Sequence, residues 1–244
     1  MYRLPVVSLL FAASVYGGTV GGPVNCGAGT TPTLTLMVNS TSYTNFGMEG
    51  SSSSGCNFAG QFGSLATTGY VVTVFGFTKS DPVIDFGMDF SGSSDPAITL
   101  MISTPYTGGP FPNLFTTTWG TLTDSDGNGT ASAMPLAGSD IVTVLVNGSP
   151  VSTASPQAPG CSFSGQAALF SQACPSSSSQ VTSGSFPSSG TLEVDAVFNL
   201  SAGDSYNING SAGFDPTPEP GSGVLMVAGL VSVVGLARRR FARQ

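Results

Sequence analysis

Histidine is absent from all 244 positions of the sequence. This absence excludes Ser-His-Asp and Cys-His arrangements, in which an imidazole takes the proton of the nucleophile. It also excludes the usual zinc hydrolase sites, whose ligand sets include histidine. Glycoside hydrolysis needs only two carboxyl groups, but any acidic surface offers such pairs, so no catalytic residue is identified. We expect no enzyme and keep a polysaccharide hydrolase as a remote alternative.

Positive charge is also scarce in this chain. Residues 18–217 contain one cation, Lys79, and twelve carboxylates, which gives this stretch a net charge of −11. Phosphate binding depends on Lys and Arg, so this charge argues against a nucleic-acid partner, and we expect none. Only 8% of residues are charged while 40% are hydrophobic, a balance that argues against disorder. We expect a folded body.

No two cysteines form a C-x-x-C pair, and without histidine a zinc site would need all four as thiolates. Disulfides in an oxidising compartment are the better interpretation. Four cysteines allow three connectivities. Pairing of sequence neighbours is favoured, which gives Cys26–Cys56 and Cys161–Cys174.

The first residues have the layout of a secretory signal peptide. Arg3 precedes an apolar run over 4–15, and small residues follow. We place cleavage after Gly17, which makes 1–17 the signal peptide.

The C-terminal segment predicts a single transmembrane helix. Residues 221–237 carry no charge and are just long enough to span a bilayer. Leu and Val side chains make insertion only marginally favourable, so orientation depends on the arginines that follow, each of which costs about 2.5–3.5 kcal/mol to bury. These are Arg238, Arg239, Arg240 and Arg243. They should stay in the cytoplasm with the body outside; a buried helix of the body would leave them unexplained.

Pro218, Glu219 and Pro220 lie immediately before this span. Two prolines around one residue hold an extended conformation that an enzyme's groove can bind. Pro-Glu-Pro, a short apolar helix and a terminal arginine cluster together resemble a PEP-CTERM sorting signal. The resemblance covers about the last 28 residues, with Gly221 where Ser or Thr is common. It implies export, processing by a membrane exosortase, and a setting of exopolysaccharide or biofilm, but no activity for the body.

Between the two ends, short runs of β-branched and aromatic residues alternate with Gly, Ser, Pro, Asn and Asp. Eight runs predict strands: 33–38, 70–77, 83–90, 97–103, 114–123, 140–146, 191–200 and 205–214. Such spacing indicates an all-β fold, an antiparallel β-sandwich or jelly-roll-like ectodomain over 18–215. The serine-rich stretch 175–190 predicts a flexible loop, and 216–244 is the sorting and anchor segment. Stretches 80–105 and 119–133 are also loosely similar to ectodomains of PEP-CTERM proteins.

One acidic segment matches the first half of a calcium loop. Asp124, Asp126 and Asn128 alternate before Gly129, as D-x-D-x-N-G requires. Pro135 stands where an EF-hand needs Glu, and D-G and N-G are strong turn dipeptides. A hairpin turn is therefore the favoured interpretation. A calcium site remains the alternative, with Asp140 as a further ligand.

The single tryptophan, Trp119, predicts core packing, since a lone Trp in a sandwich is usually buried. The alternative is sugar stacking, to which tyrosines could contribute; these are Tyr43, Tyr70, Tyr106 and Tyr206.

The function expected first is a non-enzymatic cell-surface or matrix protein. A carbohydrate-binding module, with or without calcium, is the alternative. Ice binding through a flat Thr-rich face formed by 31–36 and 114–123 is remote.

Overall fold

The structure is a computed structural model that describes residues 32–46, 48–51, 55–79, 82–136, 140–151, 160–174 and 178–215. The expected signal peptide and the segment 216–244 lie outside these residues, so both stay predictions. Within the described part, no helix is long and apolar enough to cross a membrane.

Every regular element in the described part of the chain is a β-strand. The strands are β1 (Thr33–Val38), β2 (Thr41–Thr44), β3 (Met48–Ser51), β4 (Gly55–Ser64), β5 (Tyr70–Lys79), β6 (Val83–Gly92), β7 (Ala97–Thr107), β8 (Phe111–Thr123), β9 (Ala131–Pro135), β10 (Val142–Val146), β11 (Ser149–Pro150), β12 (Cys161–Phe163), β13 (Ser171–Ala173), β14 (Ser178–Phe186), β15 (Ser189–Leu200) and β16 (Ser205–Phe214).

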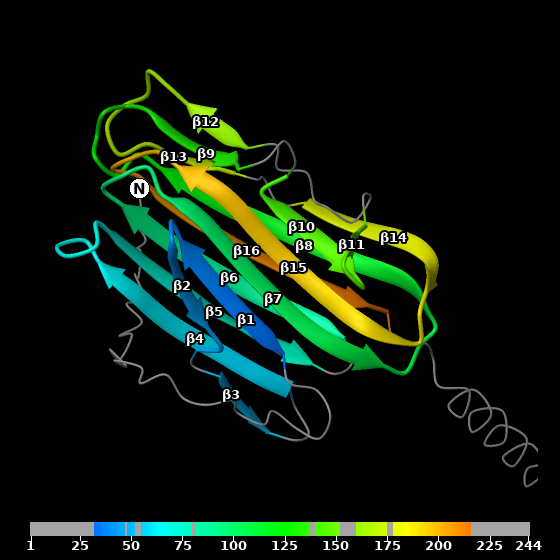
Figure 1. Ribbon diagram of the computed structural model, residues 1–244. Coiled ribbons are helices and arrows are strands. Elements are labelled where there is room, and N and C mark those ends of the chain that lie inside the picture. The colour runs from blue at the N-terminus through cyan, green and yellow to red at the C-terminus, as the bar shows by residue number, and fades with distance from the viewer. Residues whose placement is uncertain are drawn as a thin grey trace, which may run out of the picture.

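These strands form two antiparallel sheets that lie one over the other (Figure 1). Sheet A has the order β11-β10-β15-β7-β1-β2, and β9 and β12 extend it beside β15. Sheet B has the order β13-β8-β16-β6-β5-β4-β3, with β14 also paired to β8. The chain passes repeatedly from one sheet to the other, for example from β6 to β7 and from β15 to β16. The expected all-β sandwich is therefore confirmed.

The alternation of side chains along each strand explains why these two sheets pack together. In β15, Leu192, Val194 and Ala196 are buried, whereas Glu193 and Asp195 face outward. In β7 every second residue from Ile98 to Tyr106 is likewise buried. Because strand side chains point alternately to opposite faces, each sheet presents one apolar face, and the two faces form one core.

All eight strands expected from the sequence are present. The expectation of a flexible loop over 175–190 is wrong, because β14 and the start of β15 lie there. Six successive β14 residues, from Ser178 to Ser183, are in register with β8. Its main chain continues the ladder while most of its side chains stay exposed. Such an edge strand has no apolar alternation to reveal it.

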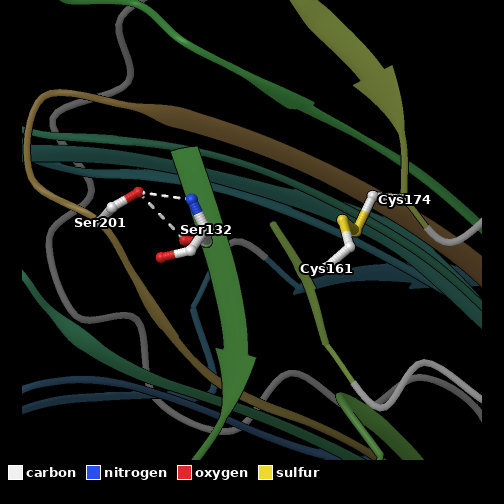
Figure 2. Close-up of a disulfide and its surroundings, with 4 residues drawn as sticks. All are labelled: Ser132, Cys161, Cys174 and Ser201. Atoms are coloured by element: carbon white, nitrogen blue, oxygen red, sulfur yellow. Dashed lines mark hydrogen bonds between the residues drawn. A yellow bond between two sulfur atoms is a disulfide. The ribbon is translucent and has the colours of Figure 1, made fainter. Parts of the chain in front are cut away.

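A disulfide between Cys161 and Cys174 joins the two sheets. Cys161 begins β12 in sheet A, and Cys174 follows β13 in sheet B, with Cα atoms 6.0 Å apart. Figure 2 shows the bridge near Ser132 of β9, whose backbone N–H donates to Ser201 Oγ at 2.7 Å. The expected Cys161–Cys174 pairing is confirmed. Cys56 is buried in β4; Cys26 lies outside the described residues, so the Cys26–Cys56 pairing stays a prediction.

Replacing Cys161 and Cys174 together by Ser should lower the free energy of unfolding. The bridge closes a segment with a sequence separation of 13, and a loop of that size constrains the unfolded chain by about 3 kcal/mol. Denaturant unfolding of the full-length chain measures the difference, with exposed Ser162→Ala as the control. A double variant as stable as the parent would show that the bridge does not hold the sheets together.

Candidate functional site

Two places in the structure gather polar or aromatic side chains that the core does not need. The first is a group of loops at one end of the sandwich, where the chain crosses between the sheets. Segments 93–96, 124–130, 164–170 and 201–204 meet there through backbone hydrogen bonds, such as Asp124 N–H to Phe170 O at 2.9 Å and Gln166 N–H to Gly129 O at 3.2 Å.

Asp124 is the anchor of the loop from β8 to β9. Its side chain is fully buried, and its carboxylate accepts backbone N–H bonds from Gly127 at 2.8 Å, Asn128 at 3.2 Å and Gly129 at 2.9 Å. Burial raises the pKa of Asp124, but hydrogen bonds from the backbone of Gly129, Gly127 and Leu169 and from the Asp126 side chain together hold the pKa below its usual value. The Asp124 carboxylate therefore stays ionised, and the backbone N–H groups that donate to it stabilise its negative charge.

The hairpin interpretation of this segment is wrong, since β8 belongs to sheet B and β9 to sheet A. The loop is a crossover, and it approaches the β15–β16 loop closely. Asp204, buried in that second loop, accepts the Ser125 N–H at 3.3 Å and the Ser201 hydroxyl. The acidic segment thus holds two sheets together at one end.

Three carboxyl groups converge here, with one oxygen from each lying within 4.8 Å of the others: Asp124, Asp126 and Asp204. The third is Asp204, where sequence analysis considered Asp140. Burial raises the pKa of Asp204, partly against the hydrogen bonds from Ser201 and Ser125. Asn128 uses its amide within the loop, with Nδ2 donating to Asp126 at 2.8 Å.

These three carboxyl groups could bind a hard cation only through those oxygens that do not already accept hydrogen bonds. Calcium takes six to eight oxygen ligands, whereas Asp124 already accepts three backbone donors. Asp126 and Asp204 retain lone pairs, so any cation would bind at the rim of the group. The structure thus accounts for Asp124 as a loop anchor without a metal.

The second place is the outward face of sheet B. Trp119 lies there on β8 with 47% of its surface exposed, so the prediction that it packs in the core is wrong. Among the tyrosines considered for sugar stacking, Tyr70, Tyr106 and Tyr206 are buried. Tyr43 is half-buried, and its hydroxyl pairs with Tyr70 at 3.0 Å; this hydrogen bond, and then burial, raises the pKa of Tyr43 to about 12.

Trp119 belongs to a row of residues that runs straight across four strands. Trp119 is in register with Asn209 of β16, Asn209 with Gly87 of β6, and Gly87 with Phe75 of β5. Phe75 is 42% exposed. A Cβ added at Gly87 would lie 2.3 Å from Phe75 Cζ. The missing side chain therefore lets the phenyl ring lie across β6, toward Trp119.

A polar ladder runs beside this aromatic row. Asn209 Nδ2 donates to Asn207 Oδ1, and Asn207 Nδ2 donates to Asp89 Oδ1. Both asparagines face outward because strand side chains alternate, and each is fixed by its neighbour. Sequence analysis missed Phe75, Asn207, Asn209 and Asp89; the N-x-N spacing in β16 was the available signal that two amides share a face.

The Thr-rich segments considered for ice binding do not form one face. Thr33 and Thr35 lie on β1 in sheet A, whereas Thr116 and Thr118 of β8 in sheet B point into the core, where they are at most 2% exposed. This arrangement overturns the flat Thr-rich face.

The outward face of sheet A carries a perturbed carboxyl group, Asp195. Its side chain is half-buried, and its Oδ1 has no hydrogen-bond partner. Burial, followed by the nearby charge of Glu193, raises the pKa of Asp195 to about 7. Two neighbouring carboxyl groups are the minimum for glycoside hydrolysis, but here they lie along one strand of a sheet face.

Replacing Asp124 should loosen the loop crossover. Asp124→Asn puts an amide where backbone N–H groups donate, so we expect a lower midpoint of thermal unfolding than for the control Asp126→Asn. Adding Ca²⁺ to the parent should leave the midpoint unchanged, because Asp124 is already occupied. A Ca²⁺-dependent rise that Asp204→Asn abolishes would instead establish a cation site.

Asp195 should make the protein less stable as pH rises. Its folded-state pKa, about 7, lies above the ordinary value of 3.8. The contribution of Asp195 to the free energy of unfolding is therefore fully present below pH 3.8 and is lost as the pH rises through 7. Asp195→Asn should raise the free energy of unfolding by about 1–2 kcal/mol at pH 8, after allowance for solvent screening, and change it little at pH 4. Denaturant titrations at the two pH values test this, and equal effects at both would contradict it.

No known family model matches the sequence, and no curated protein matches it. Among solved structures, the chain has a likeness to the enzymatically active domain of tailspike protein 4 of bacteriophage CBA120, at 12% identity and a TM-score of 0.21. The match covers 74% of this chain and 19% of the tailspike chain. A likeness this weak carries no argument about fold or function.

Proposed function

We propose that this chain is a non-enzymatic exported protein of the cell surface or extracellular matrix, sorted and anchored by a PEP-CTERM tail. The observation that carries the proposal is the order of three signals at the C-terminus: Pro218-Glu219-Pro220, the uncharged run 221–237 and the arginine cluster. The body supports it with the Cys161–Cys174 disulfide, a bond typical of proteins outside the cytosol.

The proposed topology follows from charge. The arginines remain on the cytoplasmic side, where anionic lipids attract each by about 1 kcal/mol. The uncharged run spans the inner membrane, and the sandwich lies outside. An exosortase-type enzyme then processes the tail, after which the body is held at the cell surface or released into an exopolysaccharide matrix.

One observation favours a second candidate function, polysaccharide binding by the sandwich. The sole tryptophan lies on the outward face of β8. Burial of a large apolar side chain is favourable by about 1.5–3 kcal/mol, so a large aromatic group left in water suggests a ligand. Retention of the full-length chain on an immobilised polysaccharide tests this candidate.

Replacing Pro218 and Pro220 together by Ala should block processing. The double variant loses both prolines of the Pro-Glu-Pro motif, so in a host with an exosortase it should stay full-length in the membrane, while the parent becomes shorter and leaves it. Cell fractionation with intact-mass analysis measures this.

Pro216→Ala is the matched control, because it removes a proline two residues before the motif, and it should be processed like the parent. Identical mass and fractionation of the parent and the double variant would contradict the sorting function.

A further inference from the structure

We propose that the outward face of sheet B binds an extended, neutral polysaccharide chain, with Trp119 and Phe75 as its two stacking surfaces. The inference rests on the proposed polysaccharide binding and names its site and ligand class. It begins from two exposed aromatic side chains in one row across the sheet.

The spacing of the row suits a chain of sugars. The Phe75 ring lies over Gly87, so it is two strands away from Trp119, a distance of about 9.5 Å at the usual strand separation. One strand separation is close to the length of one pyranose in an extended chain. Two aromatic surfaces at this spacing can therefore contact alternate sugars, which present the same apolar ring face in a β-linked glucan.

The polar ladder supplies partners for the sugar hydroxyls. Asn209, Asn207 and Asp89 lie in and beside the same row and already hold one another in place. Each amide has a second N–H, and Asp89 has a second oxygen. Groups fixed before binding lose little conformational entropy when the ligand arrives. A hydroxyl-rich chain can therefore bind without rearranging this face.

The charge of the face selects a neutral chain. Asp85 and Asp89 face outward on β6, and the only cation in the described part of the chain, Lys79, lies at the end of β5 with Nζ 5.3 Å from the Phe77 ring centroid. A polyanion would meet like charge on this face and throughout a body of net charge −11. Asn209 of β16 lies between the Phe75 ring and Trp119, so a polar side chain interrupts the apolar surface along this row.

Two polymers with the same backbone test the ligand class on the full-length chain. Hydroxyethyl cellulose is neutral, and carboxymethyl cellulose is anionic. Trp119, as the sole tryptophan, reports binding through its own fluorescence, and affinity electrophoresis gives the dissociation constant. We expect the neutral polymer to bind at least tenfold more tightly. Equal affinity for both would overturn the neutral ligand class.

Single substitutions test the face. Trp119→Ala should weaken binding at least about tenfold, as removal of a central aromatic side chain commonly does, and Phe75→Ala at least fivefold. Met37→Ala is the matched control, because Met37 is 37% exposed on sheet A, and it should bind like the parent. Circular dichroism and thermal unfolding establish that each variant folds.

Gly87→Ala gives a test that removes no contacting side chain. The added methyl group would lie 2.3 Å from Phe75 Cζ and 2.6 Å from Asn209 Oδ1. It would displace both side chains, so binding should fall at least as far as in Phe75→Ala. Parental affinity in Trp119→Ala, Phe75→Ala and Gly87→Ala would overturn this site and leave polysaccharide binding standing. Failure of the parent to bind hydroxyethyl cellulose, galactomannan or dextran would overturn both the site and the polysaccharide-binding function.

Discussion

The shared core of the two sheets is the constraint on which the rest of the structure depends. With charged residues at 8% of the chain, ion pairs contribute little, and burial of apolar side chains supplies the stability. Each long strand must therefore turn every second residue inward. Contacts such as Phe198 of β15 against Tyr206 of β16, with ring centroids 5.0 Å apart, join the sheets across that core. Outward positions do not have to be apolar, and Trp119 and Asp195 lie at such positions.

The same constraint explains how much of the fold could be predicted. Eight runs rich in β-branched and aromatic residues, several of them alternating, were predicted as strands, and all eight are strands, because such residues fit a half-buried pleated strand. Edge strands such as β14 bury few side chains, so their sequence resembles a loop. The prediction that Trp119 is buried came from its residue type and was wrong. The alternation of side chains along β8 indicates the correct position: Leu114 and Leu122, at even-numbered positions, are buried, so Trp119, at an odd-numbered position, faces outward.

The two candidate places differ in what sequence could show. The acidic loop was visible as a motif, but its partner Asp204 lies 80 residues after Asp124, and no local pattern joins them. The face of sheet B depends on the register of four strands, which brings Phe75 and Trp119 into one row from distant segments. That face rests on central strands, whereas the acidic loop lies at an end of the sandwich, so the face is the more rigid platform.

The order of strands has a consequence for how the protein matures. β15 lies between β10 and β7, and β16 lies between β8 and β6, yet they are the final two strands of the body. Sheet A therefore has a gap in its middle until β15 is in place, and sheet B has one until β16 is in place. The body can complete its fold only when almost its whole length is available, because residues 189–214 supply an internal strand to each sheet.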